Sequence, residues 1–483
     1  MLFNSFEFIF IFFPIVFIVY FILNKYRLIK LGKLWIVLSS LFFYSWWNIA
    51  YLPLLLASLF FNFYLGKLLA RKENTKSKAL LTFGIIANVG LLGYFKYTDF
   101  FLTNVNFLFK TTFDLFNLAL PLAISFFTFQ QIAYLVDAYR KETKDYSFFD
   151  YALFVTFFPQ LIAGPIVYHA ELIPQLEGLK GKILNYKNVA IGFFIFIVGL
   201  FKKVAIADTF AAWANKGFAN SASLSVAEGW ITSLSYTMQL YFDFSGYSDM
   251  AIGLALMFNI RLPLNFNSPY KSLSIQEFWR RWHMTLNTFL TKYLYIPLGG
   301  SRKGVLRTYI NIMIIFTVSG IWHGAGWTFI IWGVMHGIAS CINRLWSRKQ
   351  LKLPPLLAWF ITFNFVNIAW VFFRATSVNQ ALEVLSSMFN IRNLRLEPTL
   401  DAQTALFNTP VEFSINFSVI QIIYVLMIAG LLIAFFAKNT YELSKTRLTN
   451  SIVGSVYITA LIAVVVYLAF SSFSNSEFIY FNF

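Results

Sequence analysis

The sequence is poor in cysteine and in charge. Cys341 is the single cysteine among 483 residues, so an intramolecular disulfide and a cysteine-based metal cluster are excluded. Its neighbours are apolar or neutral, and we expect a buried, inert thiol there. Charged residues make up only 12% of the chain, against 58% hydrophobic and 20% aromatic residues. These proportions exclude the two or more soluble domains that a chain of this length would otherwise predict.

Long apolar runs extend along nearly the whole chain. Many are long enough for a helix to cross the hydrocarbon core of a bilayer, which takes about 20 residues. The sequence therefore predicts an all-α polytopic membrane protein. The first run has no positively charged segment before it, and we expect a retained span there and not a cleaved signal peptide. The expected spans are 8–24, 34–50, 52–69, 79–94, 114–136, 188–207, 229–257, 308–322, 325–343, 353–373, 417–437 and 451–472.

Basic residues lie in alternate loops. The 38 lysines and arginines exceed the 21 acidic residues, for a net charge of +17. Loops rich in lysine and arginine stay in the cytoplasm, so this pattern explains the charge without a nucleic-acid partner and places both termini outside. The loops expected inside are 25–33, 71–78, 138–187, 258–307, 344–352 and 438–450; those expected outside are 95–113, 208–228 and 374–416.

Two interior segments differ from ordinary loops. Residues 150–168 are apolar, short, and broken by Pro159, Gly164 and Pro165. They predict a re-entrant segment that is buried in protein or lines a cavity. Residues 261–307 mix aromatic and basic residues, which is typical of amphipathic helices at the inner membrane surface.

Three of the four histidines lie near one another in the sequence, at 283, 323 and 336. An ionisable group at membrane depth marks a candidate functional site. His323 stands at a glycine-rich break between two apolar runs. It could take a proton from an alcohol or thiol, or it could be a hydrogen-bonded histidine in helix packing, and composition leaves the two open. His283 could be a second acid or base, but by itself an interfacial histidine is favoured.

The remaining ionisable residues indicate supporting roles. His336 is expected beside the site, and His169 in an inner loop. Asp243 and Asp249 lie in an apolar span, where they are expected to pair with cations or to orient a histidine. The glycine-rich basic turn at 299–304 lacks the Lys-Ser/Thr of a phosphate loop, and we expect a flexible turn there that contacts the phosphates of membrane lipid or of a cofactor. No histidine or cysteine spacing suits zinc, and no metal site is expected.

We interpret the chain as one domain, 1–483. Within it, residues 125–337 form a core that carries several characteristic sequence blocks, one after another. They are SFFTFQ at 125–130, FPQLIAGP at 158–165, YFDFSGYSD at 241–249, FWRRWH at 278–283, YIPLGG at 295–300 and WHG at 322–324. With the N-terminal spans, they resemble the membrane-bound O-acyltransferase (MBOAT) family, in its bacterial branch of alginate and peptidoglycan O-acetylation proteins.

The resemblance implies a fold and an activity. The fold is a ring of about 11–12 tilted transmembrane helices, with re-entrant segments, around a central tunnel. The activity is that of an acyltransferase in the bacterial cytoplasmic membrane. It takes an acyl group, usually acetyl, from a cytoplasmic thioester such as acetyl-CoA, which is a substrate and not a bound cofactor. The group then moves toward an extracytoplasmic glycan through an esterase-like (SGNH-type) partner protein.

The resemblance also assigns residues. His323 matches the family's membrane-embedded histidine and His283 the histidine of the upstream block, so both are the expected catalytic residues. Trp322, His336, Asp243 and Asp249 are expected to support them. Cations near the inner face would attract the phosphates of the donor; the candidates are Arg280, Arg281, Lys292, Arg302 and Lys303.

The C-terminal tail at 474–483 ends in FIYFNF. An aromatic tail of this kind is commonly part of an interfacial belt. It also resembles the C-terminal motif of the small membrane peptide in teichoic-acid D-alanylation systems, where a tyrosine is thought to carry the acyl group. This second resemblance implies that Tyr480 is an acyl carrier.

Two other functions compete with glycan acylation. One is a transporter in which the histidines relay protons, although transporters commonly show two similar halves and here the motifs gather in one region. The other is an acyltransferase that acts on a lipid or a protein directly. The sequence does not identify the glycan.

Overall fold

The structure is a computed structural model of the chain, and it describes all residues except 72–76, 391–418, 447–451 and 471–483. The described residues are helical or irregular, and no strand occurs among them. The chain divides into two compact units, Met1–Phe196 with Tyr247–Leu264 and Ile197–Gly246 with Asn265–Phe483. Tyr480 and the rest of the tail at 474–483 lie outside the described residues.

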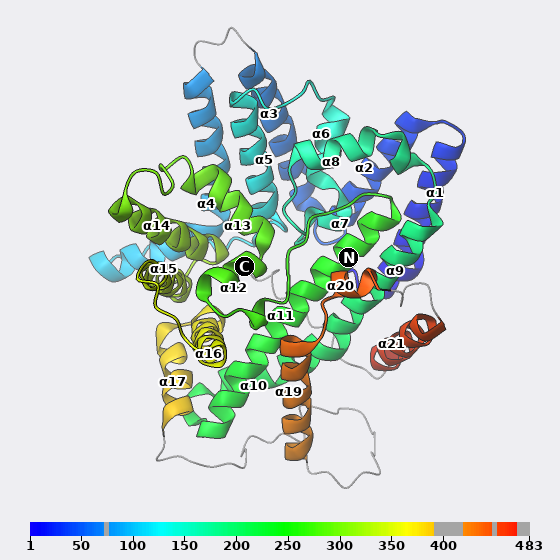
Figure 1. The fold of residues 1–483 in the computed structure, drawn as a ribbon. Coiled ribbons are helices and arrows are strands. Elements are labelled where there is room, and N and C mark those ends of the chain that lie inside the picture. The colour runs from blue at the N-terminus through cyan, green and yellow to red at the C-terminus, as the bar shows by residue number, and fades with distance from the viewer. Residues whose placement is uncertain (72–76, 391–418, 447–451, 471–483) are drawn as a thin grey trace. The chain divides into compact units, whose positions relative to one another are not determined.

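The first unit is built on apolar helices (Figure 1). A π-helical turn at Glu7–Phe12 continues into the first of them. In sequence order they are α1 (Phe13–Lys25), α2 (Ile29–Ser45), α3 (Leu52–Ala70), α4 (Ser77–Phe109), α5 (Ile124–Tyr139), α6 (Phe148–Thr156), α7 (Phe158–Leu161), α8 (His169–Glu177) and α9 (Tyr186–Phe201), whose last residues belong to the second unit.

The second unit carries the histidine-bearing segments. A π-helical stretch at Lys202–Ala207 follows α9 and leads into α10. Its helices are α10 (Asp208–Ala219), α11 (Val226–Met257, whose last turns belong to the first unit), α12 (Ile275–Arg281), α13 (Met284–Leu290), α14 (Val305–His323), α15 (Trp327–Arg348), α16 (Pro355–Arg374), α17 (Val378–Phe389), α19 (Val419–Phe436), α20 (Thr440–Ser444) and α21 (Ile452–Phe470).

Among the described residues, six helical stretches are long and apolar enough to cross a bilayer. They are Glu7–Lys25, Ile49–Ala70, Ser77–Phe109, Tyr186–Ala219, Val305–His323 and Pro355–Arg374. The number of spans is therefore smaller by this criterion than the sequence predicted. The all-α, polytopic membrane character of the chain is confirmed.

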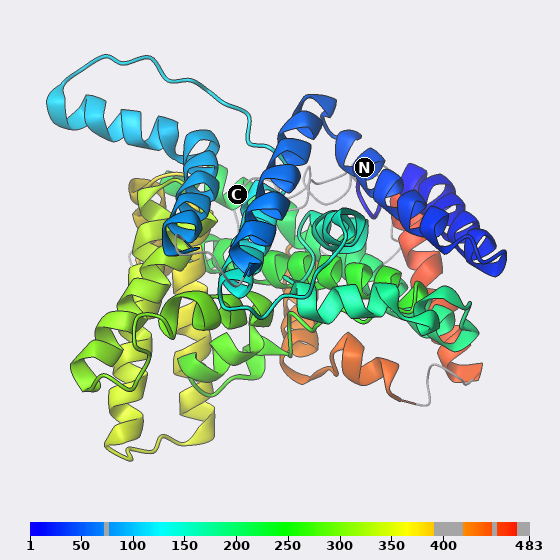
Figure 2. The same cartoon turned by 90° about the horizontal axis from the view of Figure 1, so that it is seen from above.

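The boundaries predicted around residues 95–136 are wrong. The loop expected at 95–113 is helical through Phe109, because α4 continues for 33 residues. The span expected at 114–136 is helical only from Ile124. Between these helices the chain is extended (Figure 2). Both carboxylate oxygens of Asp99 accept backbone N–H bonds there, from Phe116 at 2.8 Å and Asn117 at 2.9 Å, which satisfies these groups without a helix.

In the first unit, α3, α4 and α5 pack side by side around buried amides (Figure 1). Asn62 donates to Gln131 at 2.7 Å, and Asn88 donates to Asn62 at 2.7 Å. The residues 150–167 of the predicted re-entrant segment are buried almost throughout. They form α6 and the short α7, with Pro159 in the first turn of α7. Burial in protein is what a broken apolar segment requires.

In the second unit, α14 and α15 cross at very close range. A Cβ atom at Gly320 would collide with the carbonyl oxygen of Phe329, and one at Gly333 would collide with that of Phe316. Glycine at both positions therefore lets the two backbones touch. Because Gly320 lies one turn before the end of α14, this crossing fixes where His323 is placed.

Candidate functional site

His283 occupies a strained backbone position between two short helices. The end of α12 turns through Trp282, and His283 then adopts the left-handed conformation at φ 44° and ψ 51° before α13 begins. This conformation is uncommon for a residue with a Cβ atom, and such strain gathers at functional sites. The backbone N–H of Met284 donates to the carbonyl oxygen of Asn265 at 3.0 Å, which holds the turn in place.

Asn265 also orients the ring of His283. Its Oδ1 lies 3.0 Å from His283 Nδ1 and accepts a bond from Thr285 Oγ1 at 2.9 Å. The backbone N–H of Thr285 points to the same oxygen at 3.4 Å. Because a backbone N–H can only donate, this atom must be an acceptor, and His283 Nδ1 carries the proton that reaches it. The lone pair of the ring is therefore on Nε2.

The environment keeps the imidazole of His283 neutral. The side chain is 1% exposed, and its ring lies 4.8 Å from that of Phe244, edge to face. Burial disfavours the charged form and lowers the pKa of His283 to about 3. A neutral ring with one fixed tautomer is suited to accept a hydrogen bond or a proton at Nε2.

His323 lies beside His283. It is the last residue of α14 and is 3% exposed. The ring centroids of the two histidines are 6.5 Å apart. Aromatic rings enclose His323, with Trp322, Trp332 and Phe373 at 4.7, 5.2 and 5.1 Å between centroids. The structure thus brings together the two histidines that are 40 residues apart in the sequence.

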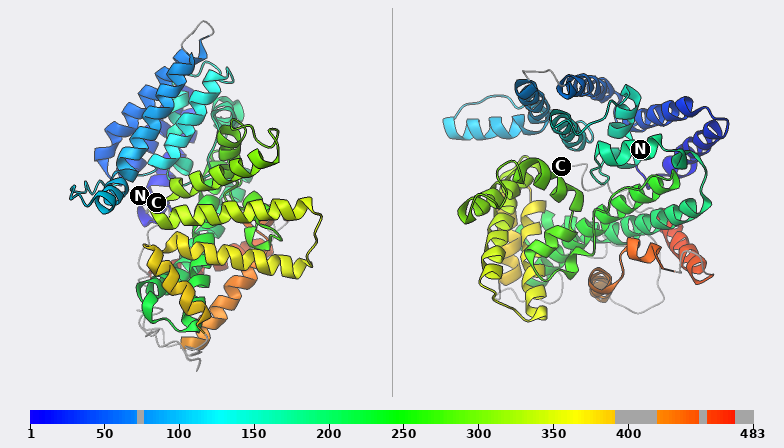
Figure 3. Two further views of the ribbon diagram at one scale, coloured as in Figure 1. Left: turned by 90° about the vertical axis from the view of Figure 1, so that its left-hand side faces the viewer. Right: turned by 45° about the horizontal axis from the view of Figure 1, so that its top comes forward.

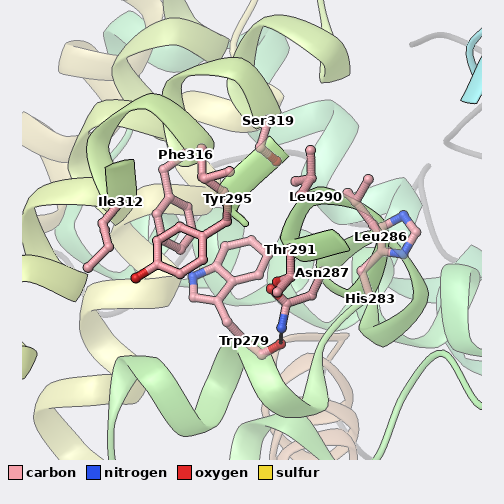
Figure 4. Close-up of a pocket in the computed structure, with 11 residues that line it drawn as sticks. Trp279, His283, Leu286, Asn287, Leu290, Thr291, Tyr295, Ile312, Phe316 and Ser319 are labelled. Atoms are coloured by element: carbon pink, nitrogen blue, oxygen red, sulfur yellow. Dashed lines mark hydrogen bonds between the residues drawn. The ribbon is translucent and has the colours of Figure 1, made fainter. Parts of the chain in front are cut away.

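A cavity of about 200 Å³ reaches His283 (Figure 4). His323 is not among the residues that line it. Its walls are mainly apolar, and Ser319, Asn287 and Thr291 supply polar groups; the other lining residues are Trp279, Leu286, Leu290, Tyr295, Ile312, Ile315 and Phe316. In Figure 4, the rings of Trp279 and Phe316 lie against each other in the wall, with 5.2 Å between centroids, and Asn287 donates to the carbonyl oxygen of Trp279 at 3.2 Å. The cavity can therefore hold a small, largely apolar group next to the imidazole.

His336 contacts the wall of this cavity and not the space inside. Its Nδ1 accepts a bond from Trp279 Nε1 at 3.3 Å, and the side chain is fully buried. Rings surround it, including Trp332 at 4.9 Å and Phe365 at 5.3 Å between centroids. His336 thus holds Trp279, which lines the cavity, and its supporting role stays a prediction. Trp322 contacts both catalytic candidates, with its ring 6.3 Å from that of His283.

The two aspartates of the YFDFSGYSD block have different surroundings. Asp243 is 2% exposed and pairs with Lys203 at 3.0 Å, while Lys203 also contacts Asp208 at 2.8 Å. The expected pairing of Asp243 with a cation is therefore present. Asp249 is half-buried in the same helix, which runs unbroken through Gly246.

The candidate phosphate-binding cations divide into two groups. Arg281 bonds Glu277 through Nη2 at 2.9 Å and also donates to the carbonyl oxygen of Asn267 at 3.1 Å, so its charge is already used in holding α12. Lys292 lies over the ring of Tyr293 at 5.0 Å. Arg280, Arg302 and Lys303 are exposed. The turn that carries Arg302 and Lys303 begins and ends with glycines at positive φ, at 299, 300 and 304.

Sequence reasoning missed two residues that shape this part of the structure. Asn265, which orients His283, lies in the irregular stretch LNFNSP, where a polar residue among aromatic ones is the available signal. Lys203 is the other, a lysine within an apolar run. Within the described residues, no group of three or more histidine, cysteine or acidic side chains could hold a metal ion.

Known proteins resemble this chain over most or all of its length. The profile of the membrane-bound O-acyltransferase family matches residues 114–381. A peptidoglycan O-acetyltransferase of Helicobacter pylori is 48% identical over 516 residues, covering 100% of this chain and 98% of the relative. A probable alginate O-acetylase of Pseudomonas aeruginosa is 39% identical over 82% of this chain and 76% of the relative. A teichoic acid D-alanyltransferase of Bacillus subtilis is 27% identical over 53% of this chain and 69% of the relative. The chain is thus an acyltransferase and belongs to the membrane-bound O-acyltransferase family.

Proposed function

We propose that this protein transfers acetyl groups from a cytoplasmic thioester, such as acetyl-CoA, across the bacterial cytoplasmic membrane to an extracytoplasmic glycan. The observation that supports this most is the pair of buried histidines beside a small cavity, with 6.5 Å between their rings. The cavity of about 200 Å³ is below the roughly 300–1,000 Å³ of pockets for larger ligands, which favours a short acyl group over a fatty one.

The transfer needs a base and an acceptor hydroxyl. In the proposed step, the acceptor oxygen attacks the thioester carbonyl carbon, and His323 takes the hydroxyl proton. The carbon–sulfur bond then breaks, and the thiolate leaves and is protonated. His283 stands on the donor side, where its fixed Nε2 is the acceptor that holds a polar group of the bound donor. Apolar walls exclude bulk water, which would otherwise hydrolyse the thioester.

Tyr480 is the proposed first acceptor. A tyrosine ester is a reactive acyl donor, so an esterase-like extracytoplasmic partner with an activated serine could take the acetyl group from it and pass it to the glycan. The resemblance of the tail to the acyl-carrying peptide of D-alanylation systems supports this role, and the chain is also similar to teichoic acid D-alanyltransferases. The cations Arg280, Arg302 and Lys303 are exposed and are proposed to attract the donor phosphates.

Peptidoglycan is the proposed glycan, because the peptidoglycan O-acetyltransferase relative matches along the full chain. A strain that lacks the gene is complemented with the parent chain or with His323→Ala, His283→Ala or Tyr480→Phe. We expect the parent alone to restore base-labile acetate on purified peptidoglycan. Tyr441→Phe is the matched control for the tyrosine, and membrane abundance of each variant is measured alongside.

Each result of this experiment has a defined meaning. Normal peptidoglycan acetylation in Tyr480→Phe contradicts the relay but not the transferase. Acetate restored on an exopolysaccharide and not on peptidoglycan indicates the alginate-type acceptor that other relatives suggest. Purified protein is also incubated with labelled acetyl-CoA; failure to transfer or hydrolyse its acetyl group would contradict acetyl-CoA as the donor.

A further inference from the structure

A second, larger hollow lies along α15 and does not include either His283 or His323 in its lining. It encloses about 500 Å³ between α15, α16 and the segment before α12. Figure 3 (left) shows α15 and α16 running side by side and joined by a short turn. We call this hollow the α15/α16 groove. Its apolar part is lined by Met335, Ile338, Ile361 and Phe365, and Ile338 and Ile361 are about half exposed.

The polar character of the groove increases in one direction along α15. Ser274 and Thr362 line it, but their hydroxyls bond backbone groups of their own helices. Asn343 is the other polar side chain in the wall, and Trp346 follows one turn later. Both lie nearer the C-terminal end of α15 than the apolar part does. Tryptophan is a residue that favours the membrane–water interface.

Cations lie at the polar end of the groove. The groove-lining residues of α15 follow a helical stripe at 335, 338, 342 and 346, and the next position of that stripe is Lys349. Lys352 directly precedes Leu353, which lines the groove. Both lysines are exposed, and the described residues contain no ion pair for either of them. No acidic residue occurs in the sequence between Glu277 and Glu383, and Glu277, which accepts the N–H of the groove-lining Leu273, is paired with Arg281.

The length of the groove matches one leaflet of a bilayer. An α-helix rises about 1.5 Å per residue, so Met335 and Trp346 are separated by roughly 16 Å along the axis. Half of a typical hydrocarbon core is about 15 Å. α15 packs along α16, which is long and apolar enough to cross a bilayer, so this separation places Met335 at acyl-chain depth when Trp346 is at the interface and Lys349 is at the headgroups.

We propose that the α15/α16 groove binds an anionic phospholipid of the leaflet that faces the 344–352 loop. An acyl chain occupies the apolar part, Asn343 bonds an ester carbonyl, and Lys349 and Lys352 bind the phosphate. The hollow distinguishes this site from an ordinary lipid-facing helix, because a specific chain can be enclosed in it. The two exposed lysines at the rim select an anionic headgroup over a zwitterionic one. This proposal does not depend on the acetyltransferase function.

The test compares two lipids with the same oleoyl chains. The purified full chain in detergent is mixed with equal amounts of phosphatidylglycerol and phosphatidylcholine, and retained lipid is counted by native mass spectrometry. We expect phosphatidylglycerol to be retained preferentially. Since each cation near the surface contributes about fivefold, removal of two should reduce the preference at least about 25-fold. The variants are Lys349→Glu/Lys352→Glu, which reverses the rim, and Ala339→Trp, which fills the groove.

The matched control is Lys25→Glu/Lys30→Glu, which reverses two exposed lysines in another basic loop. It should keep the preference of the parent. Equal retention of the two lipids by the parent would overturn the proposal, and so would an unchanged preference in the rim variant. Displacement of phosphatidylglycerol by equimolar glycerol 3-phosphate would also overturn it, because the acyl chain would then be dispensable. If Ala339→Trp does not fold, the rim variant and its control decide the question.

Discussion

Oδ1 of Asn265 lies 3.0 Å from Nδ1 of His283 and accepts from Thr285 as well. One amide oxygen therefore fixes both the tautomer of the histidine and the turn that carries it. This arrangement makes Asn265 a positioning residue for the proposed chemistry, and it can be tested apart from the histidines.

Replacing Asn265 should impair transfer through His283. Asn265→Ala removes the acceptor, and because misplacement of a reacting group by about 1 Å can cost roughly 10²-fold, acetyl transfer should fall by that order. Asn265→Asp keeps the oxygen and adds a negative charge, which raises the pKa of His283. The acidic limb of its pH–activity profile should therefore move to higher pH. A loss of activity in Asn265→Asp with an unmoved profile would indicate a purely structural role; Thr285→Val is the control.

Acid should destabilise the protein through His283. Its folded-state pKa is about 3, below the ordinary value of about 6.5, so the unfolded chain binds more protons between these limits. Stability is thus fully present above about pH 6.5 and is lost as the pH falls towards 3, by about 2 kcal/mol at pH 5. We expect the unfolding temperature of the parent to fall when the pH is lowered from 7 to 5, and to fall by more than that of His283→Gln. Equal drops in the two proteins would contradict this.

The crossing of α14 and α15 should not tolerate a methyl group. Gly320→Ala places a Cβ against the backbone oxygen of Phe329, which cannot rotate away, and overpacking of this kind costs about 1–3 kcal/mol. It should also displace His323 and reduce transfer. Gly90→Ala on α4 is the control, because nothing lies within 4 Å of a Cβ there. The change in unfolding temperature relative to the parent should be a clear decrease for Gly320→Ala, and it should be much smaller or an increase for Gly90→Ala.

The buried cation Lys203 should matter more than either aspartate beside it. Lys203→Met leaves Asp208 and Asp243 without that cation, and breaking a buried pair in this way costs about 3–5 kcal/mol. Asp243→Asn should cost less, since Lys203 keeps Asp208. Adding Asp243→Asn to Lys203→Met should recover part of the loss. The folded yield and the unfolding temperature of each variant are measured in detergent. A double variant whose loss of stability equals the sum of the two single losses would argue against the pairing.

The sequence by itself determined the class of the protein and the identity of its histidines. Apolar runs and alternating basic loops depend only on local composition, so the polytopic helical character could be predicted from them. The blocks around His283 and His323 indicated the family in the same way. Local composition could not predict the end of α4 at Phe109, because the extended chain after it is held by Asp99 through contacts 17 and 18 residues away.

Only the tertiary structure decided how these residues work together. Helix crossing at Gly320 and Gly333 brings His323 beside His283, and a backbone approach between two helices has no sequence signal beyond the glycines themselves. Asn265 bonds His283 at a turn where His283 has the left-handed backbone conformation, and no residue type in that segment predicts this conformation. The pairing of Lys203 with Asp243 likewise joins α11 to a segment 40 residues earlier. The physical reason is common to all three cases: a side chain's partner is set by packing between segments, and packing is not a property of either segment alone.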